Sequence, residues 1–179
     1  ETSILLGVKT EIDHDAIRQK TIDNYCYMAR SSEFNQAILD RTYANVERDK
    51  NRPSVVIWSL GNESGYGENF EQAAAWVKQR DPSRLVHYEN AIFQHSAHQN
   101  DTSNLDFHSE MYTGTEELDA YFADAQNQKP YLFCEYLHAM GNSCGDTEDY
   151  FQAMERHAGT CGGFVWEWCN HSPGLWRGF

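Results

Sequence analysis

The chain has 179 residues, of which 40% are hydrophobic and 13% aromatic, so it is long enough for one ordinary domain with a sizeable core. Its 14 basic and 27 acidic residues give a formal net charge of −13, which argues against binding to nucleic acid or to an anionic membrane surface. The sequence contains no apolar stretch long enough to cross a membrane.

Two helices are predicted in the first part of the chain. Apolar residues recur at helical spacing over residues 15–30 and again over residues 35–48. Ser31 and Ser32 separate the two segments, and Pro53 ends the region. We therefore expect both helices to precede the first clear strand.

The first clear strand is predicted for residues 55–60, which are nearly all apolar and rich in β-branched side chains. Such a run is typical of a strand buried on both faces of a parallel sheet. It is followed by Gly61-Asn62-Glu63. A carboxylate next to a buried strand costs desolvation free energy, and the strand ends of α/β barrels often carry catalytic groups. Glu63 is therefore a candidate catalytic residue, with a solvated loop glutamate as the equally weighted alternative.

Strands and helices alternate along the rest of the chain. The hydrophobic pattern predicts strands at residues 85–88, 105–112, 131–136 and 162–166. It predicts helices at residues 70–81, 116–127 and 146–157, and a polar loop at residues 91–104. This order indicates a parallel sheet with crossover helices. Because a closed barrel of this class needs eight strands, the predicted fold class is α/β, a partial TIM (β/α)8 barrel in which strands 1–3 are absent.

A second glutamate repeats the arrangement found at Glu63. Residues 131–136 have the sequence Tyr-Leu-Phe-Cys-Glu-Tyr, an apolar strand that ends in Glu135. Two glutamates at the ends of two parallel strands suggest the paired carboxylates of a glycosidase. The sequence contains no repeat and no linker, so we expect residues 1–179 to be a fragment of a single glycosidase catalytic (β/α)8-barrel domain.

Three motifs resemble glycoside hydrolase family 2. Residues 52–67, Arg-Pro-Ser-Val-Val-Ile-Trp-Ser-Leu-Gly-Asn-Glu-Ser-Gly-Tyr-Gly, resemble the acid/base region of the family. Residues 134–143, Cys-Glu-Tyr-Leu-His-Ala-Met-Gly-Asn-Ser, resemble the nucleophile region of its β-galactosidases. Residues 162–168, Gly-Gly-Phe-Val-Trp-Glu-Trp, resemble the strand that closes the catalytic barrel. The second motif favours β-galactosidases over the β-glucuronidases and β-mannosidases of the family, which remain the alternatives.

The resemblance implies a role for each matching residue. Glu63 matches the general acid/base, and Glu135 matches the nucleophile. The expected substrate-binding or supporting residues are Asn62 (sugar 2-hydroxyl), Tyr112 (beside the nucleophile), His138 (galactose hydroxyls) and Trp166 (aromatic platform under the sugar). Judged from the local sequence alone, His138 would be a structural histidine and Trp166 a core residue.

These roles imply retaining hydrolysis of terminal β-D-galactosides of the lactose type by double displacement. One carboxylate attacks the anomeric carbon while the other, about 5–5.5 Å away, protonates the leaving group. A Tyr112 hydroxyl bonded to Glu135 would favour the ionised nucleophile, and that charge would help Glu63 to keep its proton. The expected partner is a small-molecule β-galactoside. The alternatives are an inactive or sugar-binding relative and a generic α/β domain.

The resemblance also implies a Mg²⁺ site. In the family, a Glu-Thr-His stretch at the end of an earlier strand binds Mg²⁺ together with the acid/base glutamate. This chain opens with Glu1-Thr2-Ser3, so Glu1 and Glu63 are the expected ligands and Ser3 stands in place of the histidine. Because Mg²⁺ prefers oxygen and keeps water in its shell, we expect a weaker site. Four other histidines fit no compact metal site and are expected in solvated loops: His87, His95, His98 and His108.

The cysteines are expected to be free thiols. There are five of them, an odd number without a C-x-x-C pair: Cys26, Cys134, Cys144, Cys161 and Cys169. This pattern favours a reducing compartment and a cytoplasmic location. No signal peptide is evident, but the chain begins without Met, so we expect an internal fragment and leave secretion open. The oligomeric state of the full-length parent, a homo-oligomer included, is also left open.

Overall fold

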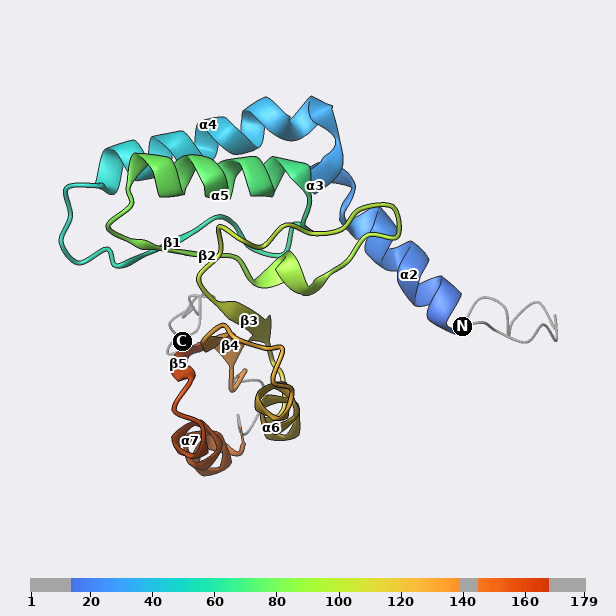
Figure 1. Ribbon diagram of the computed structural model, residues 1–179, viewed down its shortest axis with the longest axis vertical. Coiled ribbons are helices and arrows are strands. Elements are labelled where there is room, and N and C mark those ends of the chain that lie inside the picture. The colour runs from blue at the N-terminus through green and yellow to red at the C-terminus, as the bar shows by residue number, and fades with distance from the viewer. Residues whose placement is uncertain (1–13, 139–144, 168–179) are drawn as a thin grey trace, which may run out of the picture.

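The structure is a computed structural model that describes residues 14–138 and 145–167 (Figure 1). Its helices are α2 (His14–Tyr25), α3 (Tyr27–Arg30), α4 (Ser32–Asp49), α5 (Glu68–Arg80), α6 (Thr115–Ala123) and α7 (Thr147–Arg156), with the 3-10 helix η1 (Glu89–Ile92). Its strands are β1 (Ile57–Ser59), β2 (Leu85–His87), β3 (His108–Met111), β4 (Tyr131–Tyr136) and β5 (Thr160–Val165). The predicted order of strands and helices after Pro53 is confirmed. The first predicted helix is divided at Cys26 into α2 and α3.

All strand pairs are parallel, as predicted. β1 pairs with β2, with Ile57 opposite Leu85, and β3, β4 and β5 form a second sheet in that order. Most of the connections between strands contain a helix, the usual crossover for parallel neighbours. The described strands form no closed barrel, so the fold prediction is confirmed here only as an α/β arrangement of parallel strands.

Asp106 joins the two sheets where β2 would otherwise pair with β3. Its backbone N–H donates to Val86 O at 2.9 Å, and its carboxylate accepts from the Val86 N–H at 2.6 Å. The ammonium group of Lys78 on α5 lies 2.5 Å from the same carboxylate. Because a side chain takes the place of a strand carbonyl as the acceptor, the parallel ladder is interrupted between β2 and β3.

His87 is a second link between the two sheets. It is 4% exposed, and its Nδ1 lies 2.9 Å from Ser59 Oγ on one side while its Nε2 lies 2.8 Å from Ser109 Oγ on the other. Burial lowers the pKa of His87 to about 4, so the imidazole is neutral at pH 7. The expectation of a solvated loop is wrong for His87, which connects three strands, and for His108, which lies in β3.

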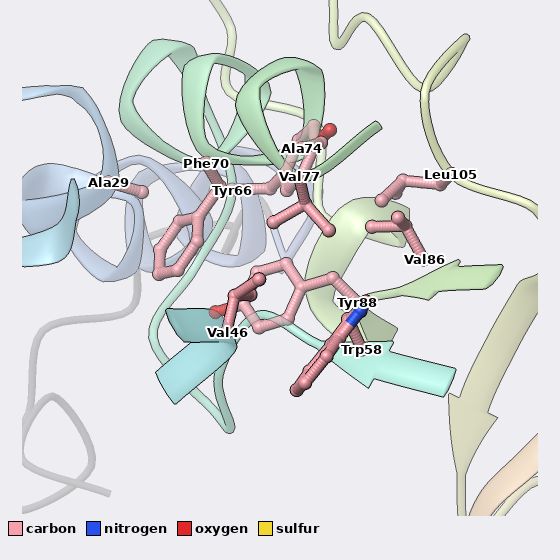
Figure 2. Packing of buried hydrophobic residues seen from close by; sticks show 10 residues of the cluster. All are labelled: Ala29, Val46, Trp58, Tyr66, Phe70, Ala74, Val77, Val86, Tyr88 and Leu105. Atoms are coloured by element: carbon pink, nitrogen blue, oxygen red, sulfur yellow. The ribbon is translucent and has the colours of Figure 1, made fainter. Parts of the chain in front are cut away.

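The first core lies between β1–β2 and the helices α4 and α5, which run side by side over the two strands (Figure 1). The buried residues of α5 recur at the spacing of one helical face and include Phe70, Ala73, Ala74 and Val77. Of these, Phe70, Ala74 and Val77 belong to one buried cluster with Trp58 and Tyr88 (Figure 2). The rings of Phe70 and Tyr88 stack with centroids 4.4 Å apart.

The second core joins α6 and α7 to the sheet of β3, β4 and β5 (Figure 1). Its buried residues are Leu118, Tyr121, Tyr131, Phe133, Tyr136, Leu137 and Ala153. β4 is the middle strand, and its residues 131–133 are all buried. Burial on both faces, the pattern expected for a strand of a parallel sheet, is therefore found in the strand that carries Glu135.

Burial on both faces was also expected for the strand predicted at residues 55–60, and there it is wrong. Trp58 is 3% exposed, whereas Val56 is 65% exposed. The helices α4 and α5 cover one face of this segment, and among residues 14–138 and 145–167 the side chain of Val56 stays largely exposed. On β5, at the far edge of the other sheet, Phe164 is 60% exposed.

The described helices and cysteines add two findings. No helix in the described ranges combines the length and the apolar character that a membrane span requires. Cys26, Cys134 and Cys161 are free thiols. Burial, and then the charges of nearby carboxylates, raise the pKa of Cys134 to about 12, so this thiol stays protonated at pH 7.

We predict that the link through His87 weakens in acid. The unfolded chain takes up the proton near pH 6.5 and the folded chain only near pH 4. The stabilisation is therefore fully present above pH 6.5 and is lost as the pH falls toward 4. Between pH 7 and pH 5, the free energy of local opening of β2 and β3 should fall by roughly 2 kcal/mol. Native-state hydrogen exchange of the complete protein that carries this sequence, corrected for intrinsic exchange, measures this quantity.

The His87→Gln variant is the control, because glutamine can bond to both neighbouring hydroxyl groups without titrating. Its opening free energy should change little over the same pH range. An equally large loss in this variant would mean that another group is responsible for the acid sensitivity.

Candidate active site

Three strand ends carry the main candidate residues. Glu63 follows β1, Tyr112 follows β3, and Glu135 is the last residue but one of β4. The backbone is left-handed at Glu63, Tyr112 and Leu137, with φ values of 46°, 52° and 55°. This conformation costs a non-glycine residue roughly 1–3 kcal/mol and is often found at functional sites. Of the described non-glycine residues with positive φ, only Asp146, before α7, lies away from these strand ends.

Tyr112 and Glu135 are joined by two hydrogen bonds. The Tyr112 hydroxyl donates to Glu135 Oε2, and the Tyr112 backbone N–H donates to Glu135 O at 2.8 Å. Burial raises the pKa of Tyr112, and the bond to Glu135 and the charges of Glu135 and Glu63 raise it further. The hydroxyl therefore keeps its proton and stays available as a donor to the carboxylate.

The loop that carries Glu63 is held by side chains that follow β2. Three consecutive backbone N–H groups donate to the side chains of three consecutive residues. The bonds run from Glu63 to Glu89 Oε1 (2.8 Å), from Ser64 to the Tyr88 hydroxyl (3.2 Å) and from Gly65 to Asn90 Oδ1 (2.9 Å). The backbone of Glu63 is thus fixed, while the residue itself is exposed to solvent.

Gly65 allows the end of α2 to lie directly against this loop. Its φ is 69°, and a Cβ atom at this position would lie 2.7 Å from both Tyr25 O and Cys26 Cα. Glycine has no Cβ and adopts positive φ at little cost. The Tyr25 hydroxyl also donates to Asn90 Oδ1 at 2.8 Å. Helix α2 therefore supports both the loop and the side chains that hold it.

Glu89 is a site residue that the sequence analysis missed. It is 1% exposed, and its Oε2 has no hydrogen-bond partner among the described residues. Burial raises the pKa of Glu89, and the charges of Glu135 and Glu63 add to this effect despite the bond from the Glu63 N–H. The signal that indicated Glu63 was present here too, because Glu89 directly follows a predicted strand, residues 85–88.

A cavity of about 190 Å³ lies among these groups, and Glu63, Glu89 and Tyr112 are part of its lining. The charges of Glu63, Glu89 and Glu135 all act on Cys134, so three carboxylates surround one region. Two larger cavities, of about 430 and 460 Å³, contain none of the predicted site residues. The chemistry of the side chains therefore singles out the smallest of the three cavities.

The predicted sugar-binding residues occupy exposed positions near the same strand ends. Asn62 precedes Glu63, and the ring of the exposed His138 lies 5.5 Å from that of Tyr112, measured between centroids. Trp166 follows β5 and is 38% exposed, and its backbone N–H donates to Tyr136 O at 2.9 Å. The local sequence alone would indicate a core residue, but Trp166 is too exposed to be one.

The predicted metal ligands are only partly described. Glu63 supplies a carboxylate of the kind that Mg²⁺ binds, whereas Glu1 and Ser3 lie outside the described residues. Within the described ranges, no three His, Cys, Asp or Glu side chains are grouped so that they could hold an ion. The described residues therefore do not form a magnesium site by themselves, and that site stays a prediction.

Comparison with known proteins identifies the family. The chain matches the model for glycosyl hydrolases family 2, TIM barrel domain, over residues 6–174. It is similar to proteins named beta-galactosidase from Actinobacillus pleuropneumoniae (66% identical, 97% of this chain), Staphylococcus xylosus (41%, 89%) and Kluyveromyces lactis (38%, 90%). The aligned part is 17%, 16% and 16% of these relatives' own lengths, so the chain spans about one sixth of each. The chain belongs to family 2 of the glycosyl hydrolases, within their TIM barrel domain.

Proposed function

We propose that the protein carrying this chain is a retaining glycosidase that cleaves terminal β-D-galactosides of the lactose type. The observation that carries this proposal is the bond from the Tyr112 hydroxyl to Glu135, at a strand end where the charge of Glu63 also acts on Tyr112. A bonded carboxylate next to a second carboxylate is the arrangement that double displacement requires. The relatives named beta-galactosidase support galactose as the sugar.

In the proposed first step, Glu135 attacks the anomeric carbon as the bond to the aglycone oxygen breaks, and Glu63 gives its proton to that oxygen. In the second step, water attacks the glycosyl ester of Glu135, Glu63 takes a proton from the water, and galactose leaves. The surroundings of the two residues suit these roles. Glu135 is half-buried and bonded by Tyr112, whereas Glu63 is exposed on a fixed backbone. Asn62, His138 and Trp166 are proposed to hold the sugar.

We also propose that the five strands belong to an eight-stranded barrel in the complete protein. Among the described strands, β1 and β5 each pair on one side only. Apolar side chains are exposed at both edges, at Val56 and Phe164. Neighbouring barrel strands and helices would pair these edges and cover these side chains.

The two glutamates can be tested separately in the complete protein. Glu135→Gln should abolish turnover of a nitrophenyl β-galactoside, because an amide cannot form the glycosyl ester. Glu63→Ala should slow the hydrolysis of unactivated galactosides roughly 10²–10⁴-fold, the usual contribution of a general acid. Azide should restore turnover of the nitrophenyl substrate by this variant, because that leaving group needs no proton and azide attacks the glycosyl ester without the general base that water requires. Steady-state rates measure all three effects.

The control is Glu116→Gln, which changes an exposed glutamate of α6 in the same way and should leave the rates unchanged. A wild-type protein that binds lactose in a calorimetric titration without cleaving it would instead be a sugar-binding relative. Cleavage of a β-glucuronide or a β-mannoside in place of the galactoside would overturn the sugar assignment.

Tyr112 and His138 should affect different kinetic constants. Tyr112→Phe removes the hydroxyl that donates to Glu135 but keeps the ring beside His138. Because a hydrogen bond to a charged group contributes about 1.5–3 kcal/mol, kcat should fall about 10- to 100-fold with little change in KM. His138→Ala should raise KM more than it lowers kcat. A Tyr112→Phe variant with normal kcat and a raised KM would contradict the supporting role of Tyr112.

The magnesium site is proposed at Glu63, with Glu1 as a second ligand and Ser3 in place of an imidazole. A bound ion would supply positive charge next to the carboxylate of Glu63. After removal of metal with EDTA, titration with Mn²⁺ followed by electron paramagnetic resonance should show binding that Glu1→Gln and Glu63→Gln each weaken. The Glu116→Gln protein is the matched control. Equal Mn²⁺ affinity in all three variants would rule out this ligand set.

A further inference from the structure

We propose that Glu89 is a positioning residue for Glu63: its carboxylate holds the backbone N–H of Glu63 and thereby sets where the carboxyl group of Glu63 lies relative to Glu135. The inference rests on the proposed function, because it assigns Glu89 a part in the protonation of the leaving group. It concerns a residue that none of the three matching sequence motifs contains.

The first argument is the conformation of Glu63. A non-glycine residue keeps a left-handed backbone conformation only where the surrounding structure enforces it. Glu89 Oε1 accepts from the Glu63 N–H at 2.8 Å, and this bond fixes the plane of the peptide that precedes the Glu63 Cα atom. The direction in which the side chain leaves the backbone depends on that plane. Because an error of about 1 Å in the position of a catalytic group can cost 10²-fold in rate, the bond acts directly on the proposed acid.

The second argument is the nature of the group. A buried carboxyl is an expensive way to supply a single acceptor, because its other oxygen must also leave water. In Glu89 that other oxygen, Oε2, is buried without a hydrogen-bond partner among the described residues. This cost arises at the proposed site, because Glu89 lies in the lining of the cavity that also includes Glu63 and Tyr112.

The third argument is the contrast with its two neighbours. Tyr88 bonds to Ser64 and packs in the first core, where its ring stacks on Phe70. Asn90 bonds to Gly65 and to the Tyr25 hydroxyl. Both hold the loop at points beyond the catalytic candidate, and their other contacts belong to the core and to α2. Of the three bonds, only the one that Glu89 accepts is donated by Glu63 itself.

The test compares substrates that differ in leaving group, in the complete protein. Glu89→Met keeps the approximate size of the side chain and removes the acceptor. We expect kcat/KM for lactose to fall about 10- to 100-fold, because its leaving group needs a proton from Glu63. We expect kcat/KM for a dinitrophenyl β-galactoside to change less than about threefold, because kcat/KM reports only the first step, in which this leaving group needs no proton. Glu89→Gln, which restores an acceptor, should recover most of the lost kcat/KM for lactose.

Equal losses on both substrates, or a Glu89→Gln variant as slow as Glu89→Met, would overturn the positioning role. If Glu89→Met does not fold, Glu89→Asp replaces it, because the shorter side chain withdraws the acceptor, and it must show the same selective loss on lactose. Glu110→Gln is the matched control: this glutamate of β3 bonds to His108 and Thr113, and its variant should leave the ratio of the two rates unchanged. A wild-type protein that cleaves neither galactoside would refute the proposed function instead, so the two failures are distinguishable.

Discussion

Three backbone N–H groups after β1 have no strand or helix partner, and the arrangement of the site depends on how they are satisfied. Unpaired buried N–H groups are costly, and one short segment, residues 88–90, supplies all three acceptors. The register of β1 against β2 therefore positions the loop that carries Glu63, because a shift by one residue, about 3.3 Å along the strand, would move the accepting side chains away from these N–H groups. The first core maintains this register, since Trp58 of β1 and Val86 of β2 pack in the same cluster with α5.

The two proposed catalytic glutamates come from different sheets. Glu63 follows a strand of the first sheet and Glu135 lies in the second. Their relative position therefore depends on the groups that connect the sheets, among them the backbone and carboxylate of Asp106 and the imidazole of His87. These links are polar and buried or half-buried, so each has a defined geometry that apolar contact alone would not impose. The relative position of Glu63 and Glu135 thus depends in part on residues that do not contact the substrate in the proposed mechanism.

The sequence predicted best those elements whose structure depends mainly on their own residues. β4 was predicted with correct bounds because it is a central strand whose apolar run is continuous. Burial of the segment around Val56 was overestimated, because the same residue types occur at covered and uncovered positions. Glu89 was missed because its contact with Glu63 joins residues 26 positions apart. Such a contact produces no periodic pattern in the sequence. The pairing of Tyr112 with Glu135, 23 positions apart, was expected only through the family resemblance, since local patterns do not encode contacts between strands.

The close approach at Gly65 limits how the chain can change in length. The backbone of Tyr25 and Cys26 leaves no room for even a methyl group at this position, so the end of α2 cannot slide along the loop. An insertion or deletion between residues 25 and 30 would therefore displace the loop after β1, although the two segments are far apart in the chain. The earlier turns of α2 have no buried residue, but Asp23 there accepts hydrogen bonds from the backbone N–H and the hydroxyl of Ser96. A change in chain length before Tyr25 would therefore act on the loop that contains Ser96, and one after Tyr25 on the loop after β1.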